Sequence, residues 1–176
     1  ELIKKIASGG PSAIGYDVNF PEQQDTQNDG ALADAIRNAG NVILPAELRL
    51  LTGDNGRPVS DASGTIQPIP LLADAAAGLG HTNITPDTDG VVRRLPLDVR
   101  SSDPRISATR PAFAELLAMR AGRMPAYQAI PQDDRGLLRI NFSGHPGFTF
   151  PVISAADVIA GTVDPTRFTG RIVLVG

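Results

Sequence analysis

The spacing of apolar residues in the first fifty positions predicts a strand, a helix and a second strand. Residues 13–20 place apolar side chains at every second position, which is typical of a half-buried strand. A helix is predicted next, capped by Asn28 or Asp29 and closed by Gly40. Residues 41–45 then form an apolar strand that stops at a proline. Two strands joined by a helix are expected to lie parallel, as a βαβ unit.

The middle of the chain is predicted to be less regular. Residues 52–66 are rich in Gly, Asn, Asp and Ser and are interpreted as a long loop, which by its length is either functional or mobile. A short helix is expected over 71–77. An antiparallel hairpin follows, with strands at 79–84 and 91–99 and its turn at 85–90, where an Asp-Gly pair is a strong turn signal.

The last third of the chain again mixes helices with strands. A helix is predicted over 109–122, strands over 137–142 and 149–153, a short helix over 154–160 and a buried strand of the parallel type over 172–175. The order of elements predicts an α/β fold. We expect a layered mixed sheet with helices packed on it, including one βαβ unit and one antiparallel hairpin.

Composition and charge narrow the function classes. The 176 residues are 41% hydrophobic, which is ordinary for a globular domain, and the net charge is only −3. The first half of the chain is acidic and the second half basic, but no basic stretch is interleaved with aromatic residues, so nucleic-acid binding is not expected. The chain has no cysteine, which excludes disulfides, thiolate zinc sites and cysteine nucleophiles.

Both ends of the sequence look cut. The chain begins within an apparent helix and stops on its most hydrophobic strand. We therefore expect one domain over residues 1–176, truncated at both ends. No apolar run approaches the roughly 18 residues that a membrane span needs, so any span is expected outside this segment.

Several stretches of the sequence, taken together and in order, resemble the CHASE type-two sensory domain. These stretches are residues 14–20, 29–44, 83–97, 140–161 and 168–176. The third contains Asp-Thr-Asp-Gly-Val-Val-Arg-Arg, and the last ends in Arg-Ile-Val-Leu-Val-Gly. The resemblance covers nearly the whole chain, although the opening strand of that family and most of its first helix are missing.

The resemblance implies an extracytoplasmic sensor module of a bacterial transmembrane receptor. Such a module lies on the periplasmic or extracellular face of the inner membrane and detects a small molecule or an envelope condition. It controls a cytoplasmic output, a nucleotide cyclase or a kinase, in a receptor that we expect to be a homodimer. The module itself is expected to be non-catalytic and to need no cofactor.

A competing interpretation is a fragment of a soluble α/β enzyme or nucleotide-binding domain. Its site would lie at the carboxyl ends of the strands, where α/β folds place ligands. Val175 and Gly176 would suit the start of a dinucleotide-binding turn, but the chain ends before the rest of that motif.

The candidate ligand site consists of Asp17, Arg93, Arg94, Asn83 and Asn141. Asp17 is placed near the carboxyl edge of the sheet, because it ends a predicted parallel strand. The two arginines occupy consecutive strand positions and should point to opposite faces, so that one of them would meet Asp17. The asparagines belong to the family-like stretches. The structural alternatives are that Asp17 caps a helix or forms a structural ion pair, and that the arginines lie on a solvated strand edge.

The remaining motifs have structural explanations. Ser154 and Asp157 fit a helix capping box. Residues 87–90 have the composition of a tight turn, and their spacing does not match a calcium-binding loop. His81 and His145 are far apart and lack a second histidine at helical spacing, so neither a zinc site nor a hydrolytic site is expected.

Overall fold

A mixed sheet runs through the computed structural model, which describes residues 1–102, 109–123, 130–145 and 148–176. Its strands within those residues are β1 (Ala13–Tyr16), β2 (Val42–Thr52), β3 (Pro58–Ile66), β4 (Gly78–His81), β6 (Asp98–Ser101), β7 (Thr109–Pro111) and β9 (Ile172–Val175). They follow the order β7-β6-β3-β2-β1-β9, and β4 pairs with β2 as well. A separate two-stranded sheet joins β5 (Arg94–Pro96) to β8 (Leu137–Arg139).

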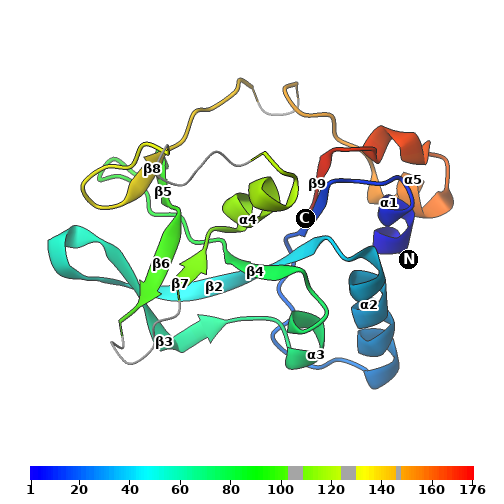
Figure 1. Ribbon diagram of the computed structural model, residues 1–176, viewed down its shortest axis with the longest axis horizontal. Coiled ribbons are helices and arrows are strands. Elements are labelled where there is room, and N and C mark those ends of the chain that lie inside the picture. The colour runs from blue at the N-terminus through cyan, green and yellow to red at the C-terminus, as the bar shows by residue number, and fades with distance from the viewer. Residues whose placement is uncertain (103–108, 124–129, 146–147) are drawn as a thin grey trace.

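Helices pack on this sheet, several of them at the end that carries β9 (Figure 1). They are α1 (Leu2–Ala7), α2 (Thr26–Ala39), α3 (Pro70–Ala73), α4 (Phe113–Arg120) and α5 (Ala155–Ala160), with short 3-10 turns η1 (Asp54–Gly56) and η3 (Pro165–Phe168). The arrangement confirms the predicted fold class, a layered mixed sheet with packed helices.

Alternate residues of β1 face two different layers. Ile14 belongs to a buried cluster with Ile36 of α2 and with apolar side chains of α1, α3 and α5. Ala13 faces the other way, toward Leu117 of α4. A Cβ atom added at Gly15 would lie 2.8 Å from the Leu117 side chain, so this glycine lets α4 approach the sheet closely.

The predicted βαβ unit is confirmed. β1 and β2 are parallel, with Ile14 opposite Val42, and α2 connects them. Gly40 ends α2 in the left-handed conformation, as expected (φ 69°). The predicted start of the helix is wrong, because Asp25 is its cap and accepts hydrogen bonds from two backbone N–H groups at 2.8 Å. Asp29 lies one turn later, where its carboxylate accepts from the backbone of Asp25 and the residue before it.

β2 does not stop at Pro45, as the sequence analysis predicted, but continues to Thr52. The backbone groups of alternate residues in a strand point to opposite sides, and Pro45 is on the side that faces β1. Pairing with β1 ends at Ile43, so the missing N–H of the proline interrupts no ladder hydrogen bond. On its other side β2 pairs with β4.

Most of the stretch predicted as a loop over 52–66 is strand. β3 folds back on β2 as an antiparallel hairpin, in which Leu51 lies opposite Val59. The Ser-Asp-Ala-Ser-Gly sequence of β3 lacks an apolar alternation, and its conformation is set by its neighbours β2 and β6. Only the tip, around η1, is irregular.

The hairpin predicted over 79–99 does not form. β4 is parallel to β2, whereas β5 pairs with β8, and β6 pairs with β3 and β7. The predicted turn is nevertheless present, since Gly90 has φ 80° and its N–H donates to the Asp87 carbonyl. The antiparallel hairpin of the predicted fold class is therefore β2–β3. The turn signal was local and correct, but the partners of the flanking strands were not encoded locally.

The C-terminal third shows further differences, including a shorter strand than the one predicted over 137–142, since β8 ends at Arg139. The predicted helix over 109–122 is preceded by β7, so that α4 begins only at Phe113. Residues 149–153 are not a strand, and Val152 is 85% exposed. β9 is a parallel strand, as predicted, and pairs with β1, but it is not buried: it lies at the sheet edge and Leu174 is 69% exposed. Ser154 precedes α5 without a side-chain capping bond, whereas Gly161 closes that helix in the left-handed conformation, as a C-terminal glycine should.

Candidate functional site

Asp17 lies directly after β1, at the carboxyl end where the sequence placed it. Its backbone N–H donates to the Val175 carbonyl at 2.7 Å, so β1 and β9 end together at this edge. The Asp17 side chain is exposed, and no ion pair or hydrogen bond joins its carboxylate to the part of the chain that the structure describes. The predicted pairing of Asp17 with Arg93 or Arg94 is therefore wrong, while its role as a ligand contact stays a prediction.

Arg93 and Arg94 both turn toward Asp87, in the turn that precedes them. Arg93 lies 3.2 Å from the Asp87 carboxylate and bonds both oxygens of Asp89 at 2.9 Å. Arg94 donates to the other Asp87 oxygen at 2.6 Å. The expectation that the two arginines point to opposite faces is wrong, because β5 begins only at Arg94 and strand alternation does not extend to Arg93.

The two predicted asparagines have different surroundings. The Asn83 amide bonds both backbone groups of Leu48: it accepts from the N–H at 2.9 Å and donates to the carbonyl at 2.7 Å. The strand pairing of β4 with β2 ends at Ala46, and the Asn83 amide takes the place of a strand partner further along β2. Asn141 is exposed and lies two residues beyond β8. The structure does not bring Asn83 and Asn141 together with Asp17.

Asp133 extends the ion pairs of the arginines into the turn before β8. One oxygen of its carboxylate accepts from the backbone N–H groups of Arg135 and Leu137, at 3.0 and 2.9 Å. The other oxygen lies 3.4 Å from the Arg135 guanidinium and 3.8 Å from that of Arg94. Burial alone would raise the pKa of Asp133, but these donors outweigh it and hold the pKa below its usual value.

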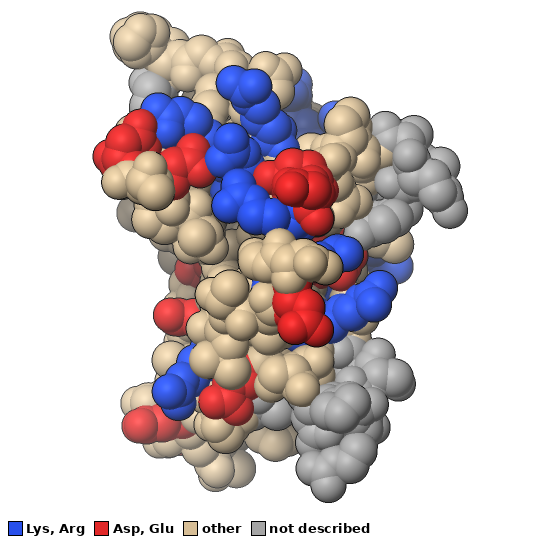
Figure 2. All heavy atoms as spheres, turned by 90° about the vertical axis from the view of Figure 1, so that its left-hand side faces the viewer, with Lys and Arg blue, Asp and Glu red and all other residues tan. Residues whose placement is uncertain are grey.

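Acidic and basic side chains therefore alternate from Asp89 through Arg93, Asp87, Arg94 and Asp133 to Arg135. Figure 2 shows the side of the molecule on which β5, β6 and β8 lie, and both kinds of charged side chain gather in its upper half. The hydrogen bonds from Arg93 hold the pKa of Asp89 below its usual value. These side chains are partly or mostly exposed, so we assign them a positioning role rather than a large share of the stability.

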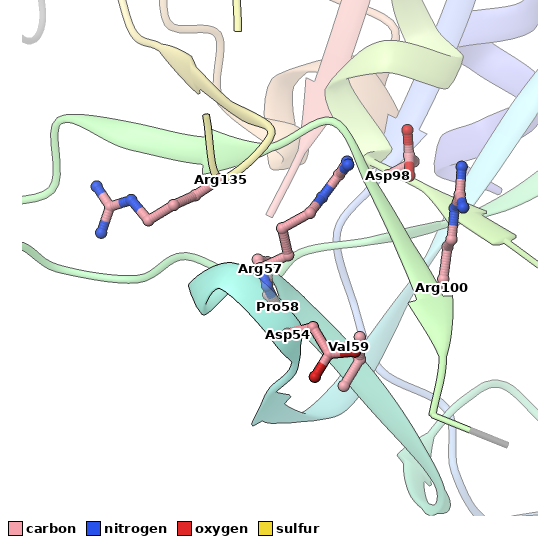
Figure 3. Close-up of a pocket in the computed structure, with 7 residues that line it drawn as sticks. All are labelled: Asp54, Arg57, Pro58, Val59, Asp98, Arg100 and Arg135. Atoms are coloured by element: carbon pink, nitrogen blue, oxygen red, sulfur yellow. The ribbon is translucent and has the colours of Figure 1, made fainter. Parts of the chain in front are cut away.

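A pocket of about 190 Å³ opens where this charged series ends. We call it the hairpin pocket, because the tip of the β2–β3 hairpin forms one wall and β6 another (Figure 3). Its lining residues are Asp54, Arg57, Pro58, Val59, Asp98, Arg100 and Arg135. The pocket thus joins three segments that are far apart in the sequence.

The charges of the hairpin pocket favour an anionic occupant. Arg57 and Arg100 make no side-chain ion pair or hydrogen bond with the residues that the structure describes. Asp98 already interacts with another group of the chain, and Asp54 points away from Arg57 and Arg100 in Figure 3. The stem of Arg135 completes the lining, while its guanidinium is engaged by Asp133. Two guanidinium groups are therefore available as hydrogen-bond donors.

Two buried ionisable groups lie within the electrostatic reach of Asp98. His81 is 2% exposed, its ring nitrogens lack hydrogen bonds of good geometry, and burial lowers its pKa to about 4 against the opposing effects of the Pro96 carbonyl and Asp98. Burial raises the pKa of Glu115 above its usual value, and the charge of Asp98 acts in the same direction. In the described ranges, no group of three or more His, Asp or Glu side chains is placed to hold a metal ion.

Comparison with known families decides what kind of domain this is. The family model of the CHASE2 domain matches residues 1–176, the whole chain. The chain belongs to the CHASE2 domain family. That family consists of extracellular, non-catalytic sensory domains, which agrees with the sensor interpretation and not with the enzyme interpretation. No curated protein and no solved structure matches the chain. None of the helices in the described residues is both long enough and apolar enough to cross a bilayer.

The hairpin pocket of this CHASE2 domain was not identified from sequence. The only signal was the long polar stretch over 52–66, interpreted as functional or mobile, which contains Arg57 but gives no partner for it. Arg100 is brought beside it by the parallel pairing of β3 with β6, in which Val59 lies opposite Arg100. That pairing has no local sequence signature.

Proposed function

We propose that this CHASE2 domain is the extracytoplasmic sensor module of a bacterial transmembrane receptor and controls a cytoplasmic nucleotide cyclase or kinase. The observation that carries the proposal is the match of a sensory-domain family over the whole chain. The hairpin pocket supports it, because the pocket presents donors that the described part of the chain leaves unused.

The construction of the pocket suits a sensor. Its walls come from the β2–β3 tip, from β6 and from the turn before β8. Backbone pairing joins β3 to β6, whereas the tip meets the turn before β8 through the side chains of Arg57 and Arg135. An occupant that bonds two walls favours the arrangement in which they are close. A signal shifts the receptor only by its differential affinity for two arrangements, and we further propose that a homodimer transmits that shift.

The location of the domain is tested by cysteine labelling in the full-length receptor. The 176 residues contain no cysteine, so Asn38→Cys on the exposed face of α2 introduces one defined thiol into this domain, and the receptor without this substitution measures the labelling of any other thiol. In intact spheroplasts, a membrane-impermeant maleimide should label this variant. The buried Ala13→Cys variant is the matched control and should react only after unfolding. Labelling of Asn38→Cys only after permeabilisation would place the domain in the cytoplasm and refute the proposal.

A further inference from the structure

We propose that the hairpin pocket binds a small molecule carrying a phosphate or carboxylate group, held chiefly by Arg57 and Arg100. The inference deepens the proposed function and depends on it in one respect, because the ligand is a signal only if the domain is a sensor. The binding itself is a property of the pocket and is argued from its residues alone.

The head of Arg57 lies against the backbone of Gly136 rather than beside an acidic partner. A Cβ atom added at Gly136 would lie 2.5 Å from Arg57 Nη2 and 2.9 Å from the central guanidinium carbon. The guanidinium thus rests on the backbone of the turn before β8. Arg57 is exposed and forms no ion pair with a described carboxylate, so its N–H groups can bind an anion that enters from outside.

Arg100 reaches the same side of the sheet. Val59 and Arg100 are register partners in β3 and β6, so their side chains share a face. Arg57 precedes Val59 by two positions in extended backbone, which places it on that face as well. Figure 3 shows the guanidinium groups of Arg57 and Arg100 extending to the same side of the hairpin.

Two guanidinium groups on one face select an oxyanion. The planar fork of an arginine matches the paired oxygens of a carboxylate or a phosphate, and binding to both arginines would use two such forks. Without an occupant, neither guanidinium forms an ion pair with a described carboxylate, although Asp98, which has another partner, also lines the pocket. An anion adds a negative charge to a lining of three arginines and two aspartates and gains charge-assisted hydrogen bonds.

The size and walls of the pocket restrict the ligand further. A volume of about 190 Å³ is below the range of roughly 300–1,000 Å³ that is usual for pockets of drug-sized ligands. Pro58 and Val59 add an apolar wall beside the arginines. The pocket therefore fits inorganic phosphate or a short carboxylic acid, and not a nucleotide or a peptide.

Calorimetric titration of the 176-residue chain tests the inference, with sodium phosphate and sodium succinate as separate probes at constant ionic strength. Saturable binding of phosphate alone would assign a phosphate ligand, and binding of succinate alone a carboxylate ligand. Arg57→Gln and Arg100→Gln should each lower the affinity for the anion at least about tenfold, because each removes a charged hydrogen-bond donor. Arg57→Lys keeps the charge but not the fork, and should recover only part of the affinity.

Arg49→Gln is the matched control. Arg49 lies on the same hairpin, its side chain is 65% exposed, and it faces Asp61 at 3.7 Å rather than the pocket. This variant changes the net charge equally and should bind within about twofold of the wild type, because exposed charges at a distance are screened. Thermal unfolding of each variant verifies that it is folded.

Two results would overturn the inference. One is that neither anion binds saturably, and the other is that Arg49→Gln loses as much anion affinity as Arg57→Gln and Arg100→Gln. Neither result bears on the location of the domain. Conversely, phosphate binding together with labelling only from the cytoplasmic side would support the anion site in the hairpin pocket and refute the proposed function. The two proposals therefore fail separately.

Discussion

The guanidinium of Arg57 rests on the backbone of Gly136, at a position that a side chain on residue 136 would occupy. This contact joins the tip of the β2–β3 hairpin to the turn before β8. Gly136 also has φ 74°, a left-handed conformation that other residues adopt at a cost. One glycine therefore serves both the turn and the space that the head of Arg57 occupies.

Gly136→Ala should displace Arg57 and weaken anion binding. The left-handed backbone should also cost about 1 kcal/mol of unfolding free energy. Gly90→Ala is the matched control, since Gly90 has φ 80° but no heavy atom within 4 Å of an added Cβ. We expect similar chemical-denaturation losses in the two variants and a loss of phosphate or succinate affinity in Gly136→Ala alone. Equal affinities would show that Arg57 is not positioned by this glycine.

Asn83→Ala should destabilise the domain by about 2 kcal/mol, because it leaves both the N–H and the carbonyl of Leu48 without their partner. Asn141→Ala, an exposed position in the same candidate set, should stay within about 0.5 kcal/mol of the wild type. Urea denaturation midpoints compare the two variants. If Asn83→Ala were as mild as Asn141→Ala, the amide would not be part of the β2 ladder.

The two N-caps should respond differently to alanine. Asp25→Ala removes an acceptor of two helical N–H groups and should cost about 1 kcal/mol. Ser154→Ala removes no capping hydrogen bond and should cost less than about 0.5 kcal/mol. Thermal unfolding of both variants measures the difference, and a larger loss in Ser154→Ala would restore the capping box that the sequence suggested.

His81 should make the domain less stable in acid. Its pKa is about 4 in the folded chain and about 6.5 when unfolded, so between these values the unfolded chain binds more protons. Stability should therefore fall as the pH decreases from about 6.5 to 4, by at most about 3 kcal/mol from this group. Glu115 acts in the opposite direction, because its raised pKa favours the folded state in acid.

Variants of the two histidines of the chain test whether His81 causes the loss of stability in acid. In His81→Gln, the unfolding free energy should change less with pH between 6.5 and 4 than it does in the wild type. His145→Gln, at an exposed position, should follow the wild type. Denaturation curves at several pH values provide the comparison, and identical curves for wild type and His81→Gln would show that another group controls acid stability.

Features set by local chemistry could be predicted from the sequence. The βαβ unit follows from apolar spacing, and Gly40 and Gly161 close their helices because a left-handed residue is needed there. Features set by distant partners could not be predicted. β2 continues through Pro45 because β1 has ended beside it, and β3 is a strand because β2 and β6 flank it.

The same distinction holds for the site. The sequence identified Arg93 and Arg94 as charged centres, but the acids that bond them lie in their own turn and not at Asp17. The placement of Arg57 and Arg100 in one pocket could not be predicted, because it depends on the register of β3 with β6, which are separated in the chain by a helix and other strands. An anion site built across a sheet in this way has no motif along the chain.

The central claim, that an anion in the hairpin pocket is the signal of a receptor, is tested most directly by the catalytic output of the full-length protein. Right-side-out membrane vesicles are loaded with the output substrate, and phosphate or succinate is added outside. The account predicts that cyclase or kinase activity changes saturably with anion concentration. The concentration that gives half of this change should rise at least about tenfold in Arg100→Gln and stay the same in Arg49→Gln. An output that ignores both anions, or that responds identically in the two variants, would contradict it.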